Sequence, residues 1–288
     1  MTDLLIHPKT MLQFDNFLKN PSHALLIEGS PGAGKGMLAN DIASKLLGVH
    51  STVLNSYPYL MRLSVNDKSI PIAAIREVQQ FMRLKTTGNN SIRRLVIVEG
   101  ADAMTIEAQN AFLKLFEEPP EDTVLILTSV PNSALLPTIY SRLQRIRVTN
   151  PSKEDVINYF ENQGLKSTDI ARAYYISEGS VGLMTALLND EDDGTAKHIN
   201  LAKELMAERP FNRLIQIDTI SKDKELLPDL LFSLQRVVHA VLVQASEKGN
   251  IPHVKRTYKA LKRIIEAENA LSHNPNLKLL LTDLFLNI

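Results

Sequence analysis

Gly29-Ser30-Pro31-Gly32-Ala33-Gly34-Lys35-Gly36 follows the apolar run 24–27 and precedes a segment in which Leu38, Ile42 and Leu46 recur at helical spacing. An apolar run, a glycine-rich turn and a helix, in that order, are the context in which G-x-x-x-x-G-K forms a phosphate-binding loop. The glycines let backbone N–H groups close around phosphate oxygens, and the lysine reaches the terminal phosphates. The sequence therefore predicts a P-loop; the alternative is an ordinary glycine-rich turn with a surface lysine.

Within this loop the residues expected to contact a nucleotide are Gly29, Gly32, Gly34, Lys35 and Gly36. Position 36 departs from the motif, because a Ser or Thr there would ligate Mg²⁺ and glycine has no hydroxyl group. The lysine has its own alternative interpretation, as a relic that only packs the loop.

A second departure follows the apolar run 95–98. A hydrolysing site of this kind has Asp-Glu after that strand, one carboxylate for the metal and one to orient the attacking water. Here the strand is followed by Glu99 and Gly100, so the second carboxylate is missing. Glu99 is either a residual metal ligand or a strand-end carboxylate satisfied by a neighbouring backbone. We therefore expect no turnover, and only weak binding of ATP or ADP with Mg²⁺.

Three continuous apolar runs of strand length, 24–27, 95–98 and 124–127, alternate with helical segments in the first half of the chain. Strands that are apolar on both faces are typical of a parallel sheet covered by helices on each side. Residues 1–150 are therefore predicted to form a doubly wound α/β domain. Beyond residues 150–152, an Asn-Pro-Ser boundary, strand-like runs become rare and helical periodicity predominates, which predicts an all-α remainder.

The overall composition excludes several classes of protein. The chain has 32 Lys plus Arg and 32 Asp plus Glu, a balance that argues against neutralising nucleic-acid phosphates as its main role but allows a local basic patch. It has no cysteine, which excludes disulfides and zinc ribbons, and its histidines have no metal-ligand spacing. The N-terminus lacks signal-peptide features and no apolar run approaches a membrane span, so we expect a cytoplasmic protein without a membrane partner.

Four stretches of the chain resemble one known family. Residues 99–105 (EGADAMT) and 108–120 (AQNAFLKLFEEPP) resemble the E-x-A-D-K-M-T and A-N-A-L-L-K-x-L-E-E-P-P segments of bacterial clamp-loader AAA+ subunits. Residues 136–144 (LPTIYSRLQ) are similar to that family's L-P-T-I-x-S-R-C-Q and differ at Leu143. Residues 270–281 resemble its closing helix, so the likeness extends over essentially the whole chain.

The resemblance implies an AAA+ ATPase-fold core at 1–150, a small helical lid at 151–193 and a C-terminal helical collar at 194–288 that joins subunits into an arc. The delta-prime class of this family commonly carries a damaged ATP site, and the chain's two glycine departures favour that class. The lid arginine that senses the γ-phosphate in the family corresponds here to Leu183. Many relatives insert a four-cysteine zinc module, and its absence between Gly48 and Tyr57 implies a zinc-free variant.

Two further site residues come from the resemblance. Thr128 or Ser129 would match the family's polar sensor of the γ-phosphate; a structural hydrogen bond is the alternative. Arg142, in the Ser-Arg of residues 136–144, would be presented at a subunit boundary as an arginine finger acting in trans on a neighbouring subunit. The alternative for Arg142 is a surface salt bridge.

The function that the resemblance implies is that of a non-hydrolysing (stator) subunit in ATP-dependent loading of the sliding clamp onto primed DNA. The implied partners are the motor subunits and the clamp-opening subunit of the loader, the sliding clamp, and primed DNA indirectly. Two alternatives stay open: an ATP-hydrolysing motor subunit of the same loader, and a P-loop scaffold protein outside replication. An intact Ser or Thr at position 36 and Asp-Glu at 99–100 would have supported the first of these.

Overall fold

The structure is a computed structural model that describes residues 5–65, 69–117, 119–189, 194–223, 226–271, 273 and 275–288. The chain separates into two compact units, Met1–Ser152 and Lys153–Ile288. The further division of the second unit into a lid at 151–193 and a collar at 194–288 stays a prediction. Its expected boundary falls at residues 190–193, which lie outside the described residues.

The first unit is built on a five-stranded parallel sheet with the strand order β2-β3-β4-β1-β5. Its strands are β1 (Ala24–Glu28), β2 (Leu60–Leu63), β3 (Arg94–Val98), β4 (Thr123–Ser129) and β5 (Gln144–Arg147). The register places Leu125 of β4 between Ala24 of β1 and Val96 of β3. Every residue of β1, β3 and β4 is buried, as expected of strands covered on both faces.

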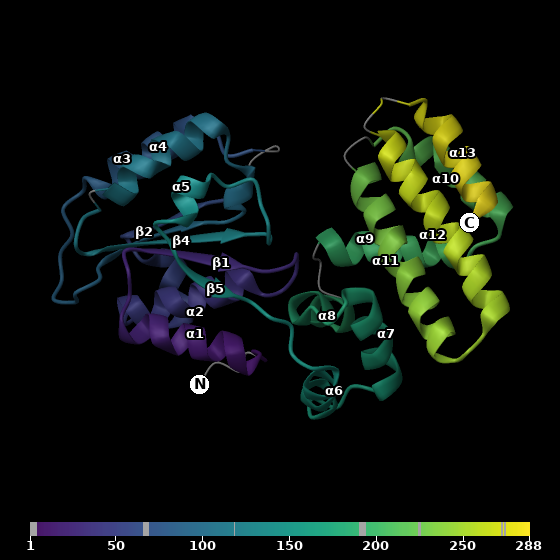
Figure 1. Cartoon of the computed structure of the whole chain (residues 1–288), viewed down its shortest axis with the longest axis horizontal. Coiled ribbons are helices and arrows are strands. Elements are labelled where there is room, and N and C mark those ends of the chain that lie inside the picture. Colours follow the sequence, from purple (N-terminus) through teal and green to yellow (C-terminus); the bar gives the residue numbers. More distant parts are fainter. Residues whose placement is uncertain are drawn as a thin grey trace. The chain divides into compact units, whose positions relative to one another are not determined.

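Helices cover both faces of this sheet. The helical elements are α1 (Pro8–Lys19), α2 (Lys35–Leu47), η1 (Ser51–Ser56), α3 (Ile72–Met82), η2 (Ala101–Ala103), α4 (Ile106–Glu117) and α5 (Pro137–Tyr140). Figure 1 shows α1 and α2 on one side of the sheet and α3 and α4 on the other. Alternate strand residues accordingly enter two separate cores, Leu26 and Val96 with α3 and α4, and Leu25 and Leu95 with α1 and α2. This arrangement confirms the predicted doubly wound α/β class.

A buried arginine ties the sheet to the end of α3. Arg94 on β3 is 2% exposed, and its guanidinium donates hydrogen bonds to the backbone carbonyls of Met82 and Leu84. Nearby, burial by itself would raise the pKa of Asp122, but a hydrogen bond from Thr86 and the charge of Arg94 outweigh it and lower that pKa. The two carbonyls at and just beyond the C-terminal end of α3 therefore receive their hydrogen bonds from one buried arginine.

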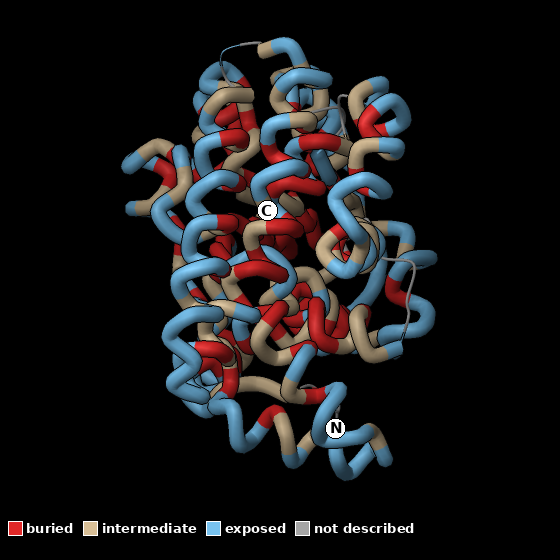
Figure 2. Tube along the Cα trace, turned by 90° about the vertical axis from the view of Figure 1, so that its right-hand side faces the viewer, coloured by how far each residue is buried: buried red, intermediate tan, exposed pale blue. Residues whose placement is uncertain are grey.

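Every element that the structure describes in the second unit is a helix, in line with the predicted all-α remainder. These helices are α6 (Lys153–Glu161), α7 (Ser167–Ser177), α8 (Val181–Leu188), α9 (Gly194–Ala207), α10 (Pro210–Ile220), α11 (Leu226–Glu247), α12 (Ile251–Leu271) and α13 (Leu277–Asn287). Helix α11 packs against α7, α9 and α12. Figure 2 shows buried stretches alternating with exposed ones along the helices, the pattern of amphipathic helices packed around a shared core.

Helix α11 corrects the expectation that no segment is long and apolar enough to cross a membrane. It has 22 residues, and an 18-residue window has a mean hydropathy of 1.5, so length and composition alone would allow a span. The same properties suit a helix at the centre of a packed unit, and Leu230, Leu234 and Val238 are fully buried in the core here. These three residues lie on one face of the helix, which is thus a packing face.

Candidate nucleotide site

The glycine-rich loop lies between the buried strand β1 and the start of α2 at Lys35. Gly32 and Gly34 have positive φ angles of 74° and 83°, a backbone conformation that favours glycine. In the described part of the chain, the N–H groups of Gly32, Gly34 and Gly36 have no hydrogen-bond acceptor. They sit in and beside the N-terminus of a helix, whose dipole favours an anion. The loop therefore has the conformation and the free donors of a phosphate-binding loop.

The side chain of Lys35 folds back onto this loop. Its Nζ donates to the backbone oxygen of Gly29 at 2.8 Å and to that of Ser30 at 2.9 Å. Burial lowers the pKa of Lys35, and the charge of Asp102 raises it in opposition. A phosphate group entering the loop would compete with these two carbonyls for the ammonium group.

The carboxylate of Glu99 faces position 36, where the metal-ligating hydroxyl is missing. A Cβ built on Gly36 would lie 4.0 Å from Glu99 Oε1. That same oxygen is 3.5 Å from Nη1 of Arg62, and Nη2 of Arg62 donates to Asn40 Oδ1 at 2.6 Å. A guanidinium group thus neutralises Glu99 without a metal ion. Arg62 is a site residue that sequence reasoning missed, because it lies on β2, a strand without a continuous apolar run.

The backbone conformation and the surroundings of Gly100 favour glycine at this position. Its φ is 68°, and a Cβ built on it would lie 2.9 Å from Cγ2 of Val65. Contacts that short essentially never occur for real Cβ atoms, and side chains rarely adopt that φ. The backbone at position 100 therefore disfavours any residue but glycine, including the glutamate that a hydrolysing site needs.

Two further polar residues at this edge of the sheet, Thr128 and Asp102, make structural hydrogen bonds. Thr128 Oγ1 accepts from the backbone N–H of Gly100 at 3.1 Å, the structural alternative considered for the predicted sensor. Asp102 Oδ1 accepts from the backbone N–H of Val130 at 3.4 Å. Because β3, β4 and β1 are parallel neighbours, their carboxyl ends bring the loop, Glu99 and Thr128 to the same edge of the sheet.

Arg142 lies apart from that set, just beyond α5. It is exposed, and its Nη1 donates to the backbone oxygen of Thr138 at 3.0 Å. Among the described residues it has no carboxylate partner, in contrast to the surface salt bridge considered as the alternative. The segment before α5 is fixed by Gln109 of α4, which accepts from the N–H of Leu136 at 2.8 Å. This anchored turn therefore presents to solvent a guanidinium group that has no carboxylate partner among the described residues.

Leu183, at the position expected for a lid arginine, lies on α8 and is 2% exposed. It belongs to the core of the second unit together with Ile176 and Leu230. A buried leucine cannot contact a phosphate group, so this position supplies packing and no charge.

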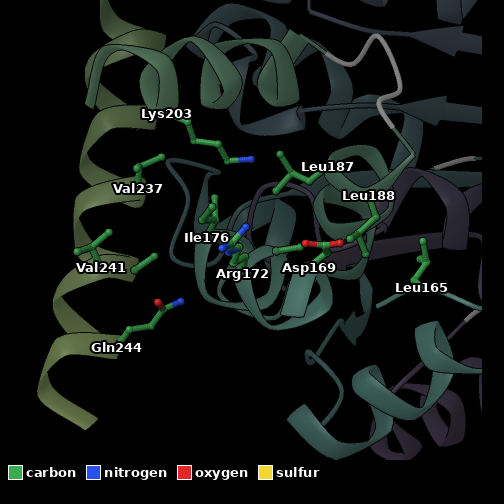
Figure 3. A pocket seen from close by; sticks show the side chains of 12 residues that line it. Leu165, Asp169, Arg172, Ile176, Leu187, Leu188, Lys203, Val237, Val241 and Gln244 are labelled. Carbon is green, nitrogen blue, oxygen red and sulfur yellow. The ribbon is translucent and has the colours of Figure 1, made fainter. Parts of the chain in front are cut away.

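The second unit also contains a hollow of about 490 Å³ between helices α7, α8, α9 and α11. Figure 3 shows its mostly aliphatic lining, with Asp169, Arg172 and Lys203 as the charged side chains. None of the predicted nucleotide-contacting residues lines it, so it is separate from the site described above.

Comparison with known proteins gives the family. The sequence model of the family described as "DNA polymerase III, delta subunit" matches residues 6–152, which are 147 of the 288 residues. The chain belongs to this family. It is similar to subunit delta′ of DNA polymerase III from Haemophilus influenzae, with 30% identity over 49% of this chain and 47% of that protein. The delta′ subunit of Pseudomonas aeruginosa is 34% identical over 42% of this chain and 41% of that protein.

The matched part spans less than half of these two bacterial relatives, and the matches confirm the predicted delta-prime class of the AAA+ clamp-loader family. Among solved structures, the DNA polymerase III gamma subunit-related protein of Thermotoga maritima matches with a TM-score of 0.54 at 19% identity. That match covers 96% of this chain and 97% of the Thermotoga chain. At this identity it shows the fold alone, and it confirms the predicted AAA+ core followed by helices.

Proposed function

We propose that the chain is the non-hydrolysing (stator) subunit of a replicative sliding-clamp loader, and that it supplies Arg142 in trans to a neighbouring motor subunit. Its partners are the motor subunits and the clamp-opening subunit of the loader. The complex acts on the sliding clamp and on primed DNA, which this chain contacts only indirectly. The proposed location is the cytoplasm. Family membership supports this assignment over a P-loop scaffold outside replication.

The observation that carries the proposal is the state of position 100. A glutamate at this position would be strained by the left-handed φ of 68°, and its Cβ would force Val65 to shift. Gly36 removes the hydroxyl ligand of Mg²⁺. Arg62 neutralises the one remaining carboxylate, Glu99. These features together argue against the motor-subunit alternative.

Arg142 supports the second half of the proposal. Guanidinium groups suit transition-state stabilisation in phosphoryl transfer because they stay charged and offer a planar fork to phosphate oxygens. The exposed side chain of Arg142 has no carboxylate to neutralise it among the described residues. A chain that does not hydrolyse ATP itself retains a use for such a residue when a neighbouring site needs it.

The purified chain is expected to release phosphate from ATP at the background rate, with or without primed DNA, because two groups that hydrolysis needs are absent. The double variant Gly36→Ser/Gly100→Glu is expected to stay at background as well, since the new side chain at 100 would meet Val65. A phosphate-release assay on both proteins tests this. DNA-stimulated turnover that Lys35→Ala abolishes would assign the chain to the motor subunits instead.

Assembly is tested separately by co-purification. The chain is expected to elute in one complex with the motor subunits and the clamp-opening subunit of the same organism. Elution of the chain alone, under conditions in which the other subunits assemble, would contradict the stator assignment.

A further inference from the structure

One helix of the second unit carries a dense positive charge on a chain of zero net charge. Five of the nine residues from 255 to 263 are Lys or Arg, and all five are exposed. We call this the α12 surface; its residues are Lys255, Arg256, Tyr258, Lys259, Lys262 and Arg263. None of them belongs to the nucleotide site, so the function proposed above does not account for them.

The packing of α12 determines where this charge points. Its buried residues are Thr257, Ala260, Ile264 and Ala267, which lie on one side of a helix with 3.6 residues per turn. On the same helical spacing, Lys255, Lys259 and Lys262 fall on the opposite side. These three lysines thus form a stripe along the helix, directed away from the core of the unit and extending over about 10 Å.

Intramolecular ion pairs neutralise only part of the α12 surface. Lys262 lies 3.9 Å from Glu266, and Arg263 lies 3.5 Å from Asp283. Lys255, Arg256 and Lys259 have no carboxylate partner among the residues that the structure describes. An ordinary solvated helix face usually mixes both signs of charge at i,i+4 spacing; here three cations remain for an external anion.

An aromatic ring lies beside the stripe. Tyr258 is 60% exposed on a helix whose other side offers a core, and helical spacing places it on the flank of the three lysines. Exposed aromatic rings flanked by cations are the means by which proteins hold single-stranded nucleic acid, since bases stack on the ring while the cations contact phosphates. Duplex DNA could bind the lysines through its phosphates, but its bases are already stacked on one another and would not stack on the ring.

We propose that the α12 surface binds single-stranded nucleic acid, with Lys255 and Lys259 on successive phosphates, Lys262 exchanging its exposed 3.9 Å pair with Glu266 for a third phosphate, and a base stacked on Tyr258. The inference goes beyond the stator role and does not depend on it, because α12 belongs to a different compact unit from the P-loop. Its test uses the full chain alone and leaves the loader out.

The first measurement is the fluorescence anisotropy of a labelled 20-nucleotide oligothymidylate titrated with the full chain. The variant Lys255→Gln/Lys259→Gln/Lys262→Gln is expected to bind at least about tenfold more weakly at low salt. The slope of log K against log salt concentration should become shallower by about 2, since each neutralised phosphate of a single strand contributes about 0.7. Glutamine is a good helix former, and circular dichroism verifies that α12 is retained.

The matched control is Lys9→Gln/Lys166→Gln/Lys222→Gln, which removes the same charge from three exposed lysines elsewhere. It is expected to bind within about twofold of the unaltered chain, since charge outside the α12 surface has little effect beyond a Debye length. Equal weakening in the control and the α12 variant, or no measurable binding by the unaltered chain, would overturn the proposal.

The ring is tested by comparing two substitutions at one position. Tyr258→Ala is expected to weaken binding by about fivefold or more, the loss of one stacked base, whereas Tyr258→Phe should bind like the unaltered chain.

Two further probes distinguish single-stranded nucleic acid from other anionic ligands. A 20-base-pair duplex that binds as tightly as the oligothymidylate would overturn the single-strand assignment. Polyglutamate of equal charge that binds more tightly would assign the surface to an acidic protein instead.

Discussion

Replacing Arg142 by alanine is expected to slow ATP hydrolysis at the neighbouring motor site by about 10³-fold or more, the usual contribution of an arginine finger. The reason is that developing charge on the transferred phosphoryl group would lose a guanidinium that the anchored α5 turn holds toward solvent. The measurement is single-turnover hydrolysis on primed DNA, in a reconstituted loader whose only hydrolysis-competent motor subunit is the one beside this chain. Clamp loading is followed in parallel.

Two comparisons make that experiment decisive. Arg145→Ala removes an exposed arginine three residues away on β5 and is expected to leave the rate unchanged. Arg142→Lys keeps the charge but loses the planar fork, so it should recover only a small part of the rate. Each variant is compared at equal assembly by gel filtration. An assembled Arg142→Ala loader with the unaltered hydrolysis and loading rates would reduce Arg142 to a boundary residue.

Arg94→Leu is expected to lower the free energy of unfolding of the first unit by about 3 kcal/mol. The substitution leaves the buried carbonyl of Met82 and the partly buried carbonyl of Leu84 without their donor, and it removes one of the two arginines beside Asp122, the other being Arg93. In urea unfolding followed by circular dichroism, the midpoint of the corresponding transition should fall by about 1 M.

The control for this substitution is Arg145→Leu, an arginine on the edge strand β5 that is exposed. It is expected to change stability by less than about 0.5 kcal/mol, as surface substitutions usually do. If Arg94→Leu unfolded at the same urea concentration as this control, its interior hydrogen bonds would contribute nothing to the attachment of α3.

The sequence predicted the centre of the sheet better than its edges. The strands β1, β3 and β4 are buried on both faces, so they appear as continuous apolar runs. The strands β2 and β5 lie at the two edges, and each has one buried residue among partly or fully exposed ones. Their side chains are mixed in polarity, so neither strand appears in the sequence as a continuous apolar run. Missing β2 also meant missing Arg62.

Helix α11 shows that hydropathy alone does not identify the surroundings of an apolar helix. Its hydropathy is that of a segment needing an apolar environment on many sides, but periodicity does not say whether lipid or other helices supply it. Only its packing against α7, α9 and α12 identifies the partner surface. Leu183 on α8 is likewise buried in the core of this unit, which its place in the sequence did not indicate.

The sequence by itself indicated the glycine-rich loop, the family, and the absence of a hydroxyl group at Gly36 and of a carboxylate at Gly100, because these depend on which atoms each residue carries. Only the tertiary structure decided how the site accommodates those losses. Glu99 meets Arg62 from another strand, and Gly100 meets Val65 with a left-handed backbone. Such contacts join residues far apart in sequence or depend on backbone dihedrals, and neither is written in the local residue pattern.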